Sequence, residues 1–257
     1  GCDMLMVAEP AYALELKELG LLHPYISTEK DNLAFDYDPD GYWYPVRISN
    51  MVLAYNPDMY SEDQVSHSLY DFAFDEGNTD LISMSNPLTS GTALASSVAL
   101  YQAYGNDYFV ALGARNVAVE SGSVALTKLE TGECKEVMIL EESVLKKRQE
   151  EDSPITCIYP EDGTICCPSP IMTIEDDKSA NANSAACEVI TDWFLSLDGQ
   201  SAIVAGWMHS VRSDYPEPPY DAIPTAEITA NLMPVDWVYC YQHRSDVRTA
   251  FEDAVKI

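Results

Sequence analysis

Residues 81–93 read LISMSNPLTSGTA, an apolar run followed by a polar turn and the start of a second apolar segment. The run is typical of a buried strand, and Ser90 or Thr92 can cap a helix that continues to residue 104. Gly91 lets the backbone come close to a ligand, and the free N–H groups of a first helical turn point outward. The segment predicts a strand, a turn and a helix that suit an anion, although a plain helix cap would show the same spacing.

A second segment has the same order. Residues 117–123 read VAVESGS, so that the turn Ser121, Gly122 and Ser123 leads from a strand into a helix. In open α/β sheets, ligands lie at the carboxyl ends of parallel strands. Two such turns would open toward one crevice, and together they favour anion binding over simple capping.

Strand-like and helix-like stretches alternate along most of the chain, which favours an α/β fold with parallel strands. Strands are expected at 4–8, 46–55, 81–85, 117–119 and 137–140, with two extended pieces within 155–174. Helices are expected at 11–22, 92–104, 123–129, 185–197 and 246–255.

The composition excludes several classes of protein. Apolar residues make up 47% of the 257 residues, which excludes a disordered chain. The formal charge of −28 opposes binding to nucleic acid, because phosphate backbones are repelled. No apolar stretch reaches the length of a membrane helix, and no basic segment of a signal peptide is found.

Arg47 is the only lysine or arginine between Lys30 and Arg115, and it lies in an apolar strand context. A guanidinium in such surroundings needs an anionic partner. The partner is either a ligand anion or one of the many carboxylates, and the sequence leaves both open.

Glu141 and Glu142 follow the expected strand 137–140 at the end where ligands lie. One of them could accept hydrogen bonds from sugar hydroxyls or an amine. Alternatively, both lie in the first turn of the next helix and interact favourably with its dipole.

Catalysis finds little support in the sequence. The four histidines are scattered, and no metalloprotease, nucleophile-elbow or P-loop motif is present. We therefore expect no enzyme, no cofactor and no metal site; a hydrolase or transferase with Glu141 or Glu142 as base is a weaker alternative. Cys157 and Cys166 flank a turn at Gly163 and could face each other across a hairpin.

Several segments in order resemble the extracytoplasmic substrate-binding proteins of ABC importers, in the branch that includes ferric-iron, phosphonate and sugar-phosphate binders. The matching segments are 3–9 (DMLMVAE), 19–25 (LGLLHPY), 38–47 (DPDGYWYPVR), 52–57 (VLAYNP), 86–93, 132–133, 159–163 (YPEDG) and 194–200 (FLSLDGQ). The resemblance covers nearly the whole chain.

The resemblance implies a two-lobed type II periplasmic binding protein fold that holds its ligand in the cleft between lobes. Lobe 1 is expected at 1–52 and 156–200, lobe 2 at 53–155, and a helical segment across the lobes at 201–257. The two serine-glycine turns fall where such proteins bind anionic groups. By position only, the resemblance adds Glu9, Tyr44, Arg47 and Glu141 as ligand-binding residues.

The chain departs from the family at its beginning. Family members start with a strand, helix, strand and helix, roughly 70 to 80 residues, before the segment that opens this sequence. We therefore expect lobe 1 to lack these elements.

The resulting hypothesis is a solute-binding protein that captures a small phosphorylated or phosphonate ligand and delivers it to a membrane permease. The resemblance implies a monomer outside the cytoplasm, in the periplasm or as a cell-surface lipoprotein of a Gram-positive organism. A ferric-iron binder of the same fold is the first alternative, suggested by sixteen tyrosines, although no two tyrosines are adjacent. The second alternative is a sensor or interaction module with a degenerate cleft.

Overall fold

The computed structural model describes residues 2–179, 183–215 and 217–256, and the chain divides into two compact units. Unit 1 comprises 1–49 and 167–225, and unit 2 comprises 50–166 and 226–257. The chain passes between the units at 49/50, 166/167 and 225/226. The expected lobe boundaries stay a prediction; the compact units include 156–166 in unit 2 and 201–225 in unit 1.

One mixed sheet has the hydrogen-bonded strand order β1-β8-β3-β6-β4-β5, with β2 also paired to β8 and β7 to β3. Its strands are β1 (Met4–Met6), β2 (Leu22–His23), β3 (Tyr44–Tyr55), β4 (Ile82–Ser85), β5 (Ala118–Glu120), β6 (Glu136–Leu140), β7 (Thr156–Ile158) and β8 (Ile165–Ile174). β3 and β8 are the two long strands that continue from one unit into the other. The α/β class is confirmed, but β1, β2 and β7 pair antiparallel, so the sheet is mixed.

Unit 1 builds its core on β8. β1 and β2 pair antiparallel with β8, and the helix α1 (Ala11–Glu18) buries Ala13 against Leu22, Trp43 and Met172. The remaining helices of unit 1 are η1 (Lys30–Asn32), η4 (Asp176–Lys178), α7 (Ser184–Leu195) and α8 (Leu197–Ala205). α1 is shorter than the expected helix 11–22, because the chain turns at Gly20, which has φ +64°, and then enters β2.

Unit 2 carries the parallel part of the sheet, in which β4 lies between β5 and β6. Each of these three strands leads into a helix: β4 into α3 (Gly91–Tyr104), β5 into α5 (Gly122–Thr131) and β6 into α6 (Glu141–Glu151). The other helices are η2 (Glu62–Gln64), α2 (Leu69–Phe74), η3 (Glu76–Asn78), α4 (Asn106–Ala114), α9 (Thr225–Ala230), which begins at the last residue of unit 1, and α10 (Trp237–Val255).

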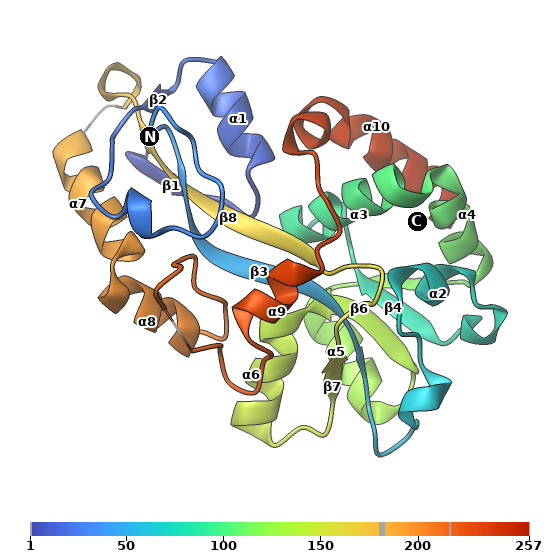
Figure 1. The fold of residues 1–257 in the computed structure, drawn as a ribbon. Helices are drawn as coiled ribbons and strands as arrows, with labels where there is room; N and C mark the ends of the chain where they lie inside the picture. The colour runs from blue at the N-terminus through green and yellow to red at the C-terminus, as the bar shows by residue number, and fades with distance from the viewer. Residues whose placement is uncertain (1, 180–182, 216, 257) are drawn as a thin grey trace. The chain divides into compact units, whose positions relative to one another are not determined.

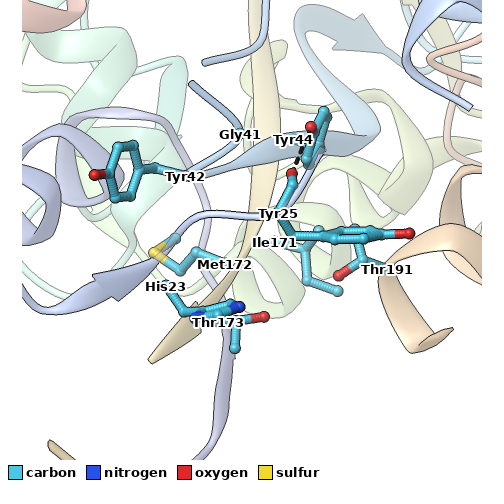
Figure 2. Close-up of a pocket in the computed structure, with 9 residues that line it drawn as sticks. All are labelled: His23, Tyr25, Gly41, Tyr42, Tyr44, Ile171, Met172, Thr173 and Thr191. Carbon is cyan, nitrogen blue, oxygen red and sulfur yellow. Dashed lines mark hydrogen bonds between the residues drawn. The ribbon is translucent and has the colours of Figure 1, made fainter. Parts of the chain in front are cut away.

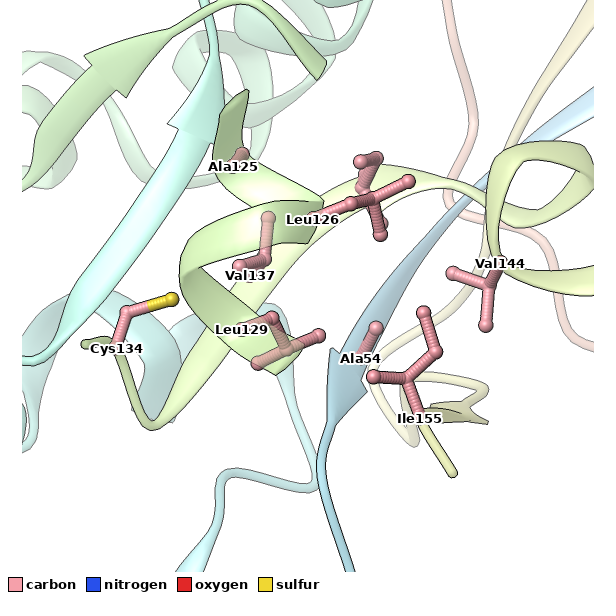
Figure 3. Close-up of a cluster of buried hydrophobic side chains, with 9 residues drawn as sticks. Ala54, Ala125, Leu126, Leu129, Cys134, Val137, Val144 and Ile155 are labelled. Atoms are coloured by element: carbon pink, nitrogen blue, oxygen red, sulfur yellow. The ribbon is translucent and has the colours of Figure 1, made fainter. Parts of the chain in front are cut away.

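A buried cluster fixes α5 against the sheet of unit 2. Figure 3 shows Leu126 and Leu129 of α5 together with Val137 of β6, Ala54 of β3 and Val144 of α6. Ala125, Leu126 and Leu129 recur at helical spacing along α5 and so form one buried face. Because this face is anchored on the sheet, the first turn of α5 is held at the end of β5.

The strands and helices predicted around the two serine-glycine turns are confirmed to within two residues at each boundary. The proposed hairpin between Cys157 and Cys166 is wrong, because β7 pairs antiparallel with β3 and places Cys157 opposite Ala54. Both cysteines are free thiols. The last helix is longer than predicted, since α10 begins at Trp237, where Asp236 caps it.

The helix α10 packs on α3 and α4 within unit 2, as Figure 1 shows. Its Phe251 is fully buried and meets the ring of Phe109 edge to face. We expect Phe251→Ala to lower the free energy of unfolding by about 3–5 kcal/mol, because it leaves a cavity in this core. Val238→Ala, at a position of the same helix that is 51% exposed, should change it by no more than about 0.5 kcal/mol. Urea unfolding of both variants measures the difference, and equal losses would contradict this role of α10.

Candidate anion-binding site

The carboxyl ends of β4, β5 and β6 meet at one edge of the unit 2 sheet and open into a cavity of about 290 Å³. Seven of its ten lining residues have polar side chains, of which only Glu120 is ionisable; the lining consists of Ser85, Asn86, Thr89, Ser90, Glu120, Ser121, Gly122, Ile139, Leu140 and Ser143. The volume is near the lower bound for small-molecule pockets in proteins. The cavity therefore suits a small, polar molecule.

Three helices begin at this cavity. The N-cap residues of α3, α5 and α6 are Ser90, Ser121 and Leu140, and all three line it. The first turn of each helix leaves backbone N–H groups without helical acceptors, and it carries roughly half a positive charge. Three such ends around one cavity offer backbone donors to an anion, although no lysine or arginine lines the cavity and the first turn of α6 carries Glu141 and Glu142.

The two serine caps form long hydrogen bonds with their helices. Ser90 Oγ accepts from the N–H of Ala93 at 3.3 Å, and Ser121 Oγ accepts from the N–H of Val124 at 3.4 Å. Both distances are long for a hydrogen bond. Since Leu140 offers no side-chain cap to α6, the three helix starts retain donors that an anion could engage.

Gly122 keeps the wall of the cavity open. A Cβ atom at this position would lie 3.5 Å from Ser85 Oγ and 3.7 Å from Ile139 Cδ1, two side chains of the lining. These are ordinary contact distances, so the glycine leaves space that a ligand can occupy close to the backbone of α5.

The structure thus brings Ser90, Ser121 and Gly122 of the predicted residues into one cavity. Thr92 and Ser123 belong to the same turns, where their hydroxyls lie 3.1 Å and 3.2 Å from those of the two capping serines. Gly91 begins α3 directly after its cap.

Sequence reasoning did not select Ser85, Asn86, Glu120 and Ser143 of the lining. The signal was present in the sequence, because Ser85 and Glu120 end strands and Asn86 directly follows one, next to the two serine-glycine turns.

The side chain of Glu141 is buried within unit 2 and accepts hydrogen bonds from two other side chains. Its side chain is 1% exposed, Oε2 accepts from Asn50 Nδ2 at 2.8 Å, and Oε1 accepts from the hydroxyl of Tyr159. The residue is the first of α6, so its charge also interacts favourably with the helix dipole. The alternative that Glu141 lies in the first turn of the next helix is thus confirmed, and the two hydrogen bonds add a structural role that the sequence did not predict. Its contact with a ligand stays a prediction.

The side chains of Tyr44 and Glu9, in unit 1, also form hydrogen bonds within the protein. The Tyr44 hydroxyl donates to the carbonyl of Tyr25 at 2.8 Å, as Figure 2 shows, and accepts from the N–H of Ser27 at 3.1 Å. Burial raises the pKa of Tyr44. The carboxylate of Glu9 accepts from the N–H of Ala11 at the start of α1. Both side chains stabilise local structure.

The pocket drawn in Figure 2 is small. Tyr44, Tyr25 and His23 line it together with other residues of unit 1, and its volume is about 10 Å³. That is at most the space of one water molecule, so the pocket is too small for a solute.

Arg47 differs from these buried polar residues. Its Nη1 lies 3.2 Å from Met208 Sδ, a weak acceptor, and its buried Nε makes no hydrogen bond with the residues that the structure describes. Among those residues no carboxylate forms an ion pair with it. The sequence left two kinds of partner open for Arg47, a ligand anion or a carboxylate of the protein. No carboxylate among the described residues is paired with it.

Within the described ranges, no three His, Cys, Asp or Glu side chains are arranged to hold a metal ion. None of the described helices combines the length and the apolar character that a membrane span requires.

Comparison with known proteins identifies one family and a set of similar folds. The family described as bacterial extracellular solute-binding protein matches residues 2–243. No curated protein matches the chain.

Among solved structures, iron-bound HitA from Pseudomonas aeruginosa has a TM-score of 0.83 at 20% identity over 98% of this chain and 82% of HitA. AfuA from Actinobacillus pleuropneumoniae, with fructose-6-phosphate bound, has a TM-score of 0.81 at 20% identity over 100% of this chain and 83% of AfuA. A periplasmic thiamin-binding protein has a TM-score of 0.80 at 15% identity over 99% and 79% of the two chains. These likenesses confirm the predicted fold class.

The role of Glu141 can be tested by Glu141→Gln. In the wild type, the two carboxylate oxygens accept from Asn50 and Tyr159. In the variant, one of these oxygens is replaced by an NH₂ group, which must face either Asn50 or Tyr159. We expect a loss of about 1–3 kcal/mol in the free energy of unfolding, because a buried donor loses its acceptor. Glu150→Gln, on the exposed part of α6, is the control for the lost charge. Equal chemical stability of the two variants would show that Glu141 has no structural role.

Proposed function

The chain belongs to the bacterial extracellular solute-binding proteins, and from this premise we propose that its solute is a small phosphorylated or phosphonate anion bound in the cavity of unit 2. Members of the family bind a small solute and deliver it to the permease of an ABC transporter. The proposal adds the chemical class of the solute and the residues that hold it.

The observation that carries the proposal is the meeting of three helix starts at one polar cavity. Phosphate groups bind at such starts through backbone N–H and hydroxyl donors. The charge of −28 does not oppose this, since distant surface charges are screened over about 8 Å at physiological salt.

We also propose Arg47, in unit 1, as an anion-binding residue. Its Nε is buried without an acceptor among the described residues, and a guanidinium binds phosphate oxygens well. Glu9, Tyr44 and Glu141 support the surrounding structure through their hydrogen bonds, and their contact with a ligand is retained as part of the proposal.

We further propose that the protein works as a monomer in the periplasm or as a lipoprotein on the cell surface, and that it performs no catalysis. Sedimentation of the purified protein tests the first point. A ferric-iron binder stays the alternative, because HitA, which has a similar fold, is iron-bound.

Isothermal titration calorimetry of protein that has been unfolded and refolded to remove retained solute tests the proposal. We expect binding of a sugar phosphate or an alkylphosphonate and none of the free sugar. Iron loading is the second arm: a coloured protein that binds iron but no phosphate or phosphonate would replace this proposal by the alternative.

Ser90→Ala should weaken binding of the anion by about tenfold, the effect of one lost hydrogen bond to a charged group. Ser68→Ala removes an equivalent cap of α2, where Ser68 Oγ accepts from the N–H of Asp71 at 2.9 Å, away from the cavity lining. Both variants should lose about 1 kcal/mol of stability, but only Ser90→Ala should lose affinity. Calorimetry together with urea unfolding separates the two effects, and a matching loss of affinity in Ser68→Ala would exclude a direct contact.

Arg47→Ala should weaken anion binding by about ten- to a hundredfold, because a charge-assisted hydrogen bond contributes about 1.5–3 kcal/mol. Lys146→Ala removes the same charge from an exposed position of α6 and should leave affinity within about twofold. Calorimetry at one fixed salt concentration compares the variants. If they behave alike, Arg47 makes no contact with the solute.

A further inference from the structure

The chain contains two Asn-Pro turns in unit 2, and each directly follows a strand. Asn56-Pro57 comes after β3, and Asn86-Pro87 comes after β4. In both turns the asparagine Oδ1 accepts from the N–H two residues further on, at 3.0 Å and 2.8 Å. The asparagine carbonyl accepts from the N–H groups three and four residues further on. Proline fixes its own φ and restricts the residue before it, so both turns are rigid.

The two turns differ at one atom, the side-chain nitrogen Nδ2. In Asn56, which is 3% exposed, this nitrogen donates to the carbonyl of Glu130 at 3.3 Å. In Asn86 it makes no hydrogen bond with any residue that the structure describes. The same backbone turn therefore leaves one amide donor unused, in the segment that leads to Ser90 and Gly91.

The orientation of the Asn86 amide follows from its partner. The N–H of Leu88 is a donor, so the atom that faces it must be the oxygen, and the nitrogen lies on the other side of the amide group. This nitrogen is accessible, because it is not one of the buried polar atoms that lack a partner in the described part of the chain. Asn86 is only partly exposed, and the open space that it lines is the cavity of unit 2. The cavity is therefore the space from which an acceptor can reach Nδ2.

The backbone of Asn86 joins the two serine-glycine turns of the site. Its N–H donates at 2.8 Å to the carbonyl of Glu120, the residue before Ser121, and its carbonyl accepts from the N–H of Ser90 at 3.0 Å. All of these residues line the cavity. The Asn86 amide is thus held next to the starts of α3 and α5, and with Oδ1 occupied it can only donate to a ligand.

Neutral donors matter here because the charged side chains at the cavity are mostly acidic. Glu120 lies in the lining, with Lys128 Nζ 2.5 Å from one of its oxygens, and Glu141 and Glu142 lie in the first turn of α6. The formal charge near the cavity therefore does not favour an anion. Binding has to come from directed hydrogen bonds at short range, so each further donor has a measurable effect on affinity.

We propose that Asn86 is a ligand-binding residue that selects a hydrogen-bond acceptor: its Nδ2 donates to an oxygen of the phosphoryl or phosphonyl group of the solute. This inference rests on the proposed anion-binding function and adds one residue to it. Because the N–H of Leu88 occupies Oδ1, the amide cannot turn over to accept from a ligand. A donor that is already held in place loses little entropy on binding.

Asn86→Asp is the main test. The carboxylate keeps an acceptor for the N–H of Leu88, but it replaces the donor by a negatively charged oxygen. We expect the affinity for inorganic phosphate and for methylphosphonate to fall by about thirtyfold or more. The urea midpoint should not change, because the turn is kept. Calorimetry at fixed pH and salt gives the affinities.

Gln64→Glu is the matched control. Gln64 is exposed, and its Oε1 accepts from the N–H of Ser61 at 3.0 Å in a capping box, which a glutamate forms equally well. The change again exchanges an amide for a carboxylate and keeps the acceptor. Since Gln64 does not line the cavity, both affinities should stay within about twofold of the wild type.

Asn86→Ala and Asn56→Ala form a second pair, which adds no charge and decides if Asn86→Asp fails to fold. Both remove the side-chain bond of an Asn-Pro turn. Asn56→Ala should have the lower urea midpoint, because it also loses the bond to the carbonyl of Glu130. Only Asn86→Ala should bind phosphate more weakly, by about tenfold.

The outcomes separate the two proposals. A wild type that binds neither inorganic phosphate, methylphosphonate nor a sugar phosphate refutes the anion-binding function, and this inference with it. If the wild type binds and Asn86→Asp matches Gln64→Glu in affinity, only the role of Asn86 is refuted. A loss of affinity that Asn56→Ala shares with Asn86→Ala would show that the turns act through the stability of the fold, and it would equally overturn the ligand contact.

Discussion

The parallel pairing of β4 with β5 and β6 is the constraint on which the candidate site depends. Parallel neighbours end at the same edge of a sheet, so the helices that follow them begin there together. The apolar face of α5 and Val144 of α6 pack against the sheet, which positions the first turns of these two helices at the cavity. The hydrogen-bond donors of the site are thus a property of the backbone, produced by strand direction and core packing.

Because the backbone supplies the donors of the site, the buried charged and polar side chains elsewhere can stabilise the fold, and those at the cavity are mostly neutral. Glu141, Tyr44 and Glu9 are buried with protein partners, as a charged or polar group away from water requires. The cavity, by contrast, is lined by hydroxyls with long cap bonds, and its single carboxylate is paired with Lys128. Neutral donors bind an anion without the desolvation cost of a buried lysine or arginine.

Much of the fold could be predicted because it is encoded locally. The apolar runs at β4, β5 and β6, and the serine-glycine turns after β4 and β5, mark where strands end and helices begin. Pairing was less predictable: Cys157 lies opposite Ala54 of β3 rather than in a hairpin with Cys166, since strand partners are chosen by packing between distant segments. Of the site, the two turns were predicted, but Glu120, which directly precedes the second turn, was not.

By itself, the sequence determined the α/β class, the family and the two turns with helix starts, because periodicity, caps and ordered motifs act over a few residues. Only the tertiary structure decided that these turns share one cavity with the start of α6, that Glu141 bonds to Asn50 and Tyr159, and that Arg47 has no carboxylate partner among the described residues. Such facts depend on which segments meet in space, and electrostatic and hydrogen-bond partners are fixed by distances of a few ångströms that sequence spacing does not contain.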